Sequence, residues 1–495
     1  MSKSRMNIDR SLVFAVLFLA AGVATAQNNI TNMWNQTGGT HNWIDSANWT
    51  NAAAYPDGTN ALAILTNNIT SSQIINLNQA ISVANLWLGD RNGDAAFTIA
   101  AGTGGSLSLG RPLANGLEMN KYGTNTDVIT AVVSNNTTIN NIYYIRAINT
   151  GGKLVFSNAV YGGAGYLKTE GNYGTIEFAG TGNNFSSAQT FMAYGYGLVL
   201  VTGRGKAADV KIQSYMTVLG GVFTNAGATS IGQWNVAGTL TVDGGSYIGS
   251  NGTWVGCIGT ERAGLGTLVV TNGGLYTAAG GGVKLYGSNT ASFVATVTLA
   301  GGAGGAGVLD VKTNIATFLT MADATNNFFN FNGGKLRYSH VTADQPQFLS
   351  SNIQVRVMDG GAEIEVATAG RTIAISNSMQ HAGAAATDGG LTKSGAGILI
   401  LSGTNTYTGA TIISNGVLSV TQTECLGTNT DVQLFSSAGT LNLNFTGTNT
   451  VHSLSVDGRT RGAGIYGASR ISQITGTGYL RTTWPPLQGT VIMMW

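Results

Sequence analysis

Charge is scarce in this sequence. Asp, Glu, Lys and Arg make up 9% of the 495 residues, against about 25% in ordinary soluble proteins. The net charge is +2 and the lysines and arginines form no basic run, so the sequence predicts no nucleic-acid partner. The 5 prolines are too few for a collagen-like chain or a proline-rich linker.

Cysteine and histidine are also rare. Cys257 and Cys425 are too few for a disulfide framework, and we expect two buried thiols, with a bridge as the alternative in an oxidising compartment. The four histidines lack the spacing of metal ligands. Residues 302–307 and 462–467 match the glycine spacing of a dinucleotide-binding loop, but no helix is expected after either. The sequence therefore predicts no cofactor and no metal site.

Glycine and alternating apolar residues are abundant instead. The chain has 72 glycines and is 43% hydrophobic, and this apolar content disfavours disorder. Short strands are expected where apolar and polar residues alternate, and Gly, Asn and Thr mark the turns between them. The unit at 238–249 recurs at 266–280. Repeats of this spacing predict an all-β fold, a parallel β-helix over residues 61–480, whose rungs bury one another's apolar faces.

Residues 1–26 have the features of a secretory signal peptide. Basic residues precede an apolar run at 12–23, and small residues lead to a cleavage site between Ala26 and Gln27. The run is shorter than a bilayer-spanning helix, which needs about 20 residues, and no later stretch is apolar enough to span. We therefore expect export to the outer surface or the extracellular space, with the periplasm as the alternative.

Three tryptophans, Trp34, Trp43 and Trp49, fall in the first mature segment, residues 27–60. Indole faces can pack on sugar rings, so this segment is a candidate glycan-binding site. A stacked β-structure must also cover its first rung, because an open end invites edge-to-edge association. Of these two interpretations we favour an N-terminal cap.

Residues 391–420 carry the most specific pattern in the chain. Alternating strands are predicted at 398–401 and 410–414, and the stretch has no carboxylate, histidine or cysteine. It resembles the autotransporter-associated β-strand repeat, also called the passenger-associated transport repeat, through Leu391-Thr392-Lys393, Gly395, Gly397, Leu399, Leu401-Ser402-Gly403, Asn405-Thr406-Tyr407-Thr408-Gly409, Gly416 and Leu418. Ile398 and Ile400 depart from the family pattern, which tends to carry Thr at both positions.

This resemblance implies a right-handed parallel β-helix in an exported bacterial surface protein. It implies no catalytic residues, because the repeat has none. Residues 454–479 resemble the closing rung of such proteins, so we expect a C-terminal cap and then a short tail at 481–495. We predict no membrane barrel and no anchor there, so the resemblance does not extend to self-transport.

Glu363 and Glu365 support a different function. Parallel β-helices also include polysaccharide lyases and glycosidases, and these two carboxylates alternate onto one face of a strand. A carboxylate pair with raised pKa values would suit a glycosidase. If Ile364 and Val366 face the core, however, both glutamates are ordinary outer-surface carboxylates.

Together these observations favour a non-catalytic structural or adhesive protein of the cell surface. The alternative is a β-helical polysaccharide-active enzyme or a glycan-binding module, and a third hypothesis is a scaffold for other exported proteins. The expected partners are surface polysaccharide or other exported proteins.

Overall fold

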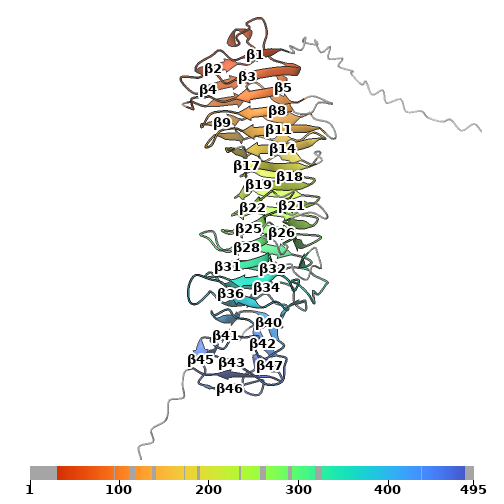
Figure 1. The fold of residues 1–495 in the computed structure, drawn as a ribbon, viewed down its shortest axis with the longest axis vertical. Coiled ribbons are helices and arrows are strands. Elements are labelled where there is room, and N and C mark those ends of the chain that lie inside the picture. Colours follow the sequence, from red (N-terminus) through yellow and green to blue (C-terminus); the bar gives the residue numbers. More distant parts are fainter. Residues whose placement is uncertain are drawn as a thin grey trace, which may run out of the picture.

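The computed structural model describes residues 30–484, apart from 94, 111–116, 137–140, 172, 187–189, 234–235, 257–263, 288–292, 318–325 and 436–437. These residues form an elongated rod, with the first strands at one end and the last strands at the other (Figure 1). The predicted signal peptide with its cleavage site at Ala26 and Gln27, Cys257, and residues 485–495 of the predicted tail lie outside the described residues.

Three ladders of parallel strands run along the rod and join into one 40-stranded sheet among the described residues. Ladder A consists of β2 (Gly39–Asn42), β4 (Gln73–Asn76), β6 (Phe97–Ala100), β9 (Thr126–Ile129), β12 (Lys153–Phe156), β15 (Thr175–Phe178), β22 (Gly238–Asp243), β25 (Gly266–Thr271), β28 (Ala295–Ala300), β31 (Asn327–Asn332), β33 (Gln354–Val357) and β36 (Met379–His381). Each rung contributes one strand to it, so sequence neighbours lie on different faces of the rod.

Ladder B is the longest of the three. It consists of β7 (Ser106–Leu109), β10 (Val132–Asn135), β13 (Val160–Tyr161), β16 (Asn183–Phe185), β18 (Arg204–Ala207), β20 (Val222–Asn225), β23 (Ser246–Gly249), β26 (Leu275–Ala278), β29 (Val308–Val311), β32 (Gly334–Tyr338), β34 (Ala362–Val366), β37 (Leu391–Ser394), β39 (Thr411–Ile413), β41 (Asp431–Leu434) and β44 (Ser453–Val456). It continues into the C-terminal repeat, where ladder A has already ended.

Ladder C covers the third face of the rod. It consists of β1 (Thr31–Met33), β3 (Gly58–Leu65), β8 (Leu117–Lys121), β11 (Ile142–Ala147), β14 (Tyr166–Gly171), β21 (Thr229–Ile231), β24 (Thr253–Val255), β27 (Val283–Leu285) and β30 (Ile315–Thr317). Three long strands bend between two ladders: β5 (Ala80–Leu88), β17 (Phe191–Val201) and β19 (Val210–Leu219). Among the described residues the only helix is the short 3-10 helix η1 (Ser46–Asn48).

The C-terminal end of the rod has two further sheets. The first is parallel and consists of β35 (Thr372–Ile375), β38 (Ile398–Leu401), β40 (Gly416–Val420), β42 (Gly439–Leu443) and β47 (Ile474–Gly476). The second consists of β43 (Thr448–Val451), β46 (Gly464–Tyr466) and β48 (Tyr479–Thr482). Here β46 pairs antiparallel with β48, and β45 (Arg459–Thr460) folds back antiparallel on β44. These reversals end the parallel stacking.

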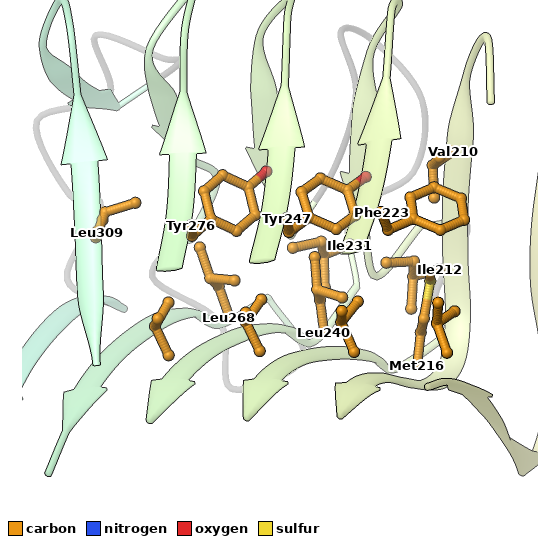
Figure 2. Packing of buried hydrophobic residues seen from close by; sticks show 14 of the residues in the cluster. Val210, Ile212, Met216, Phe223, Ile231, Leu240, Tyr247, Leu268, Tyr276 and Leu309 are labelled. Atoms are coloured by element: carbon orange, nitrogen blue, oxygen red, sulfur yellow. The ribbon is translucent and has the colours of Figure 1, made fainter. Parts of the chain in front are cut away.

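The core follows from strand alternation. On β22 the side chains of Leu240 and Val242 are fully buried, while Thr239 and Thr241 between them are half-buried on the outer face. Leu240 pairs in register with Leu268 of the next rung, so like residues stack along the rod (Figure 2). The predicted all-β fold of stacked parallel rungs is confirmed.

Aromatic rings occupy part of this core. Phe223, Tyr247 and Tyr276 hold successive inward positions on ladder B, with ring centroids 5.7 and 4.9 Å apart and nearly parallel planes (Figure 2). The hydroxyl of Tyr247 lies 2.8 Å from Oγ1 of Thr229, and that of Tyr276 lies 2.6 Å from Oγ1 of Thr253. Each buried phenol thus has a hydrogen-bond partner, as burial requires.

Rung length changes along ladder B. Before the repeat, Lys335 pairs with Glu363, and Glu363 pairs with Thr392. Within the repeat, Thr392 pairs with Ile412 and Ile412 pairs with Gln433. The sequence numbers of these partners show that much less chain lies between equivalent positions after Thr392 than before it. The rungs therefore shorten abruptly at the repeat that begins at residue 391.

Candidate functional surface

The three tryptophans lie in the core of the first rungs. Trp34, Trp43 and Trp49 are all fully buried, and Trp49 makes edge-to-face contacts with the other two at 5.1 and 4.9 Å. Their indole nitrogens donate to Oε1 of Gln73 and to the carbonyl oxygens of Pro56 and Trp43, respectively. None of these three indole faces is open for a sugar ring to stack upon.

Glu363 and Glu365 lie side by side on the outer face of β34, because Ile364 and Val366 between and after them are fully buried. Lys335 of the preceding rung reaches both carboxylates, at 2.9 Å and 3.1 Å. The guanidinium of Arg337 lies 3.0 Å from Glu365, and Oγ of Ser394 on the following rung donates to Glu363 at 2.6 Å. The two acids therefore belong to a network of ion pairs and one hydrogen bond that spans three rungs.

The electrostatics of this network do not suit Glu365 as the general acid of a glycosidase. Burial by itself would raise the pKa of Glu365, but the hydrogen bonds and charges of Arg337 and Lys335 hold that pKa below its usual value. A general acid needs a raised pKa in order to carry a proton at neutral pH. The expectation that this pair could carry raised pKa values is therefore wrong for Glu365, because its cationic partners outweigh its desolvation.

The Asn-Thr-Tyr-Thr-Gly stretch of the repeat acts as a clasp between rungs. Oδ1 of Asn405 accepts a hydrogen bond from the backbone N–H of Met379 at 2.8 Å, and its Nδ2 donates to the carbonyl oxygen of Cys425 at 2.6 Å. One buried side chain thereby connects the rung before it with the rung after it. The buried hydroxyl of Tyr407 lies 2.7 Å from Oγ1 of Thr411, repeating the Tyr–Thr contact of the central core.

A second part of the clasp centres on the buried carboxylate of Asp388. It accepts backbone hydrogen bonds from Thr408 at 2.8 Å and Gly409 at 2.9 Å. Burial would raise the pKa of Asp388, but these donors and His381 hold the pKa below its usual value. Gly409 has no space for a side chain, since a Cβ there would lie 2.3 Å from the carbonyl oxygen of Asp388. The motif residues of the repeat thus hold the fold together.

Lys393 of the repeat is a core residue, a position that sequence reasoning missed. It pairs in register with Ile364 and Ile413, and its side chain is fully buried. Its ammonium donates to the carbonyl oxygens of Ser394, Gly395 and Asn415 at 2.6, 2.8 and 3.1 Å. Burial lowers the pKa of Lys393 to about 8. The sequence does contain a signal for this burial, because Lys393 lies two residues after the inward Leu391 and strand geometry places both on the same face.

Cys425 is a buried free thiol, 3.2 Å from the carbonyl oxygen of Leu401. Burial raises the pKa of this thiol, which opposes thiolate chemistry. Residues 302–307, one of the two glycine-spaced matches, form a turn that enters strand β29. Across the described ranges, no group of three or more His, Cys, Asp or Glu could hold a metal ion. No helix in the same ranges has the length and apolarity to cross a bilayer.

Two of the hollows on the outer surface are lined by described residues. The first, about 370 Å³, lies where ladder A has ended, between residues 404–408 and 423–429, and is lined mainly by Thr and Asn. The second, about 440 Å³, lies on ladder B over β13, β16, β18 and β20. Its lining includes Tyr161, Asn184, Arg204, Lys206 and Thr224. We call it the basic hollow. Sequence reasoning missed its two cations, although their i, i+2 spacing on a strand places them on one face.

Comparison with known proteins gives two likenesses. Residues 391–420 match the family described as the passenger-associated-transport-repeat. Over 350 residues, which cover 65% of this chain, the sequence is 29% identical to the adhesin BmaC autotransporter of Brucella suis biovar 1 (strain 1330). The matched part is only 9% of that protein's length. No solved structure matches the chain.

Proposed function

We propose that this chain, an autotransporter-passenger repeat protein with its repeat at residues 391–420, is a non-catalytic adhesive rod of the bacterial cell surface. The observation that carries the proposal is the likeness of 350 residues to a protein named as an adhesin. The side-chain contacts support it, because the charged residues that could have acted as catalytic groups connect neighbouring rungs instead.

The mechanism follows from the shape and the low charge of the rod. Stacked rungs present the same outer positions many times along one axis, so weak contacts add through effective concentration. With 9% charged residues, neighbouring rods repel each other little, and a dense coat of parallel rods is compatible with this surface.

Export, and the outer surface rather than the periplasm, belong to the proposal. They rest on the sequence of residues 1–26 and on the adhesin likeness. A scaffold for other exported proteins would use the same rod, but no specific observation favours it. Glu365, one of the two carboxylates on which the enzyme alternative rests, is a poor proton donor, because Lys335 and Arg337 hold its pKa below the usual value.

A retention assay tests the proposal. Beads coated with the exported chain are passed over immobilised bacterial polysaccharide, over animal-cell matrix and over a layer of the same chain, with albumin-coated beads as the control. We expect the rod-coated beads to be retained on at least one surface under flow that removes albumin-coated beads. Retention equal to albumin on every surface would overturn the adhesive function.

A further inference from the structure

The basic hollow contains two cations, Arg204 and Lys206, that form no ion pair with any residue in the described part of the chain. Arg204 and Lys206 are exposed neighbours on the outer face of β18, about 7 Å apart along the strand. No carboxylate among the described residues forms an ion pair with either side chain, in contrast to Arg146, Lys153 and Lys335 elsewhere on the rod. Two like charges on one strand face repel each other unless an anion lies between them.

The rod itself shows what such a pair binds. Lys335 and Arg337 have the same i, i+2 spacing on the same ladder, on strand β32. There the next rung supplies Glu363 and Glu365, whose carboxylates lie about 3 Å from the two cations. In the basic hollow the next rung supplies Val222 and Thr224 instead, in register with Arg204 and Lys206. A carboxylate that completes this pair would therefore come from another molecule.

An aromatic ring lies two strands away from Lys206 on the same ladder. Tyr161 of β13 is 42% exposed and pairs with Asn184 of β16, which in turn pairs with Lys206. Two strand spacings separate Tyr161 from Lys206, about 10 Å. Gly182, an exposed residue of the lining, adds no side-chain bulk to this hollow of about 440 Å³. The ring's electron-rich face attracts the polarised C–H groups of a sugar.

We propose that the basic hollow binds an acidic polysaccharide through its uronate groups. A sugar ring lies against Tyr161, the amide of Asn184 hydrogen-bonds its hydroxyls, and the carboxylate of a neighbouring sugar lies between Arg204 and Lys206. Arginine favours this ligand because its planar guanidinium matches a carboxylate in two parallel hydrogen bonds. The inference deepens the proposed adhesive function, on which it rests, by naming the class of ligand.

Binding of the full exported chain to oligogalacturonate tests the site, with the methyl ester of the same oligosaccharide and inorganic polyphosphate as comparison probes. The site variant is Arg204→Gln/Lys206→Gln. Its matched control is Arg459→Gln/Arg461→Gln, which removes the same charge at the same spacing from exposed residues of the C-terminal end. Tyr161→Ala tests the sugar contact. Circular dichroism establishes that each variant keeps its strand content.

We expect the site variant to bind oligogalacturonate roughly tenfold more weakly, and the control pair to bind like the wild type. Tyr161→Ala and the methyl ester should each weaken binding several-fold, and added salt should weaken it further. Three results would each overturn the proposal. The first is that the wild type does not bind oligogalacturonate, and the second is that both double variants lose binding equally. The third is that polyphosphate binds as tightly as the uronate and Tyr161→Ala has no effect.

The retention assay separates this inference from the proposed function. If wild-type beads and beads with the Arg204→Gln/Lys206→Gln variant are retained equally, the rod is adhesive and the basic hollow is not its glycan site. If wild-type beads are retained nowhere, the adhesive function itself is wrong.

Discussion

Neighbouring rungs are bonded differently in the centre of the rod and in its C-terminal repeat. Around β22 to β27 every rung has three strands, and neighbouring rungs are bonded through all three ladders. In the repeat the rungs along ladder B are shorter, with Thr392 paired to Ile412 and Ile412 to Gln433, and residues 404–407 form no strand. In these rungs ladder A is missing, whereas the sheet of β35, β38, β40 and β42 continues the face of ladder C, to which the bridges Ile315–Leu349 and Gln345–Ile373 connect it.

Side chains replace that ladder. Asn405 bonds the backbone of the rung before it and the rung after it, and Asp388 accepts N–H groups that a strand would otherwise satisfy. In the centre, side chains such as Tyr247 and Tyr276 mainly fill space. A motif with many polar residues can therefore be structural, because buried backbone groups must find partners wherever a ladder is missing.

The largest expected effect is from removing the buried ammonium of the repeat. Lys393→Ala leaves three carbonyl oxygens without their donor and empties the space of a long side chain. We expect the free energy of unfolding of the C-terminal rungs to fall by about 3 kcal/mol. Urea unfolding followed by hydrogen exchange in residues 391–443 measures it. The control is Lys335→Ala on the outer face, which should lower the free energy of unfolding by less than about 1 kcal/mol. Equal losses in the two variants would contradict the expected difference between a buried and an outer lysine.

Asn405→Ala should have the next largest effect. It cuts both clasp bonds and leaves the N–H of Met379 and the carbonyl of Cys425 unpaired. We expect a loss of about 2 kcal/mol, confined to the rungs on either side. Native-state hydrogen exchange should show faster exchange near residues 379 and 425 and unchanged protection around β22 to β27. Uniform loss of protection along the rod would contradict a local clasp.

The pH dependence of stability should also distinguish the two regions. The pKa of Lys393 is about 8 in the folded chain and about 10.4 when unfolded, so the unfolded state binds more protons between these values. Stability of the repeat should therefore rise with pH in this window, by about 1 kcal/mol between pH 8 and pH 9. Urea unfolding at the two pH values measures this rise, which should vanish in Lys393→Ala. A rise of the same size in that variant would show that another group titrates.

Tyr247→Phe should have the smallest effect of these changes. It removes the hydrogen bond to Thr229, whose hydroxyl keeps a contact with Oδ1 of Asn225 at 3.2 Å, and it preserves the ring stack. We expect a loss of about 1 kcal/mol or less in the central rungs, measured by urea unfolding. If the loss were as large as that of Asn405→Ala, side-chain hydrogen bonds would stabilise the central rungs as strongly as they stabilise the repeat.

Local features of both regions could be predicted from sequence because alternation and repeats are visible there. The strand expected at 398–401 is found, and Ile364 and Val366 face the core, which is the condition under which Glu363 and Glu365 are outer-surface carboxylates. The internal repeat also predicts the correct register, since Gly238 pairs with Gly266. These features follow from the two-residue alternation of a strand and from the spacing of the repeated unit, and both can be recognised in a single sequence.

Contacts between rungs could not be predicted, because the rung length varies. On ladder B, Arg204 pairs with Val222 of the next rung, whereas Leu275 pairs with Val308, which lies much farther along the chain. Without the register, Lys335 cannot be assigned to the glutamates of the next rung. For the same reason it could not be predicted that Arg204 and Lys206 form no ion pair with a residue of the described ranges.

The most direct test of a rod without catalysis is product release from glycans. The exported chain and the variant Glu363→Gln/Glu365→Gln are incubated with a panel of acidic and neutral polysaccharides, and reducing ends and unsaturated sugars are measured. We predict no product from either protein, because Lys335 forms ion pairs with both glutamates and Arg337 forms one with Glu365. Product from the wild type that disappears in the variant would contradict it and make this chain a glycan-cleaving enzyme.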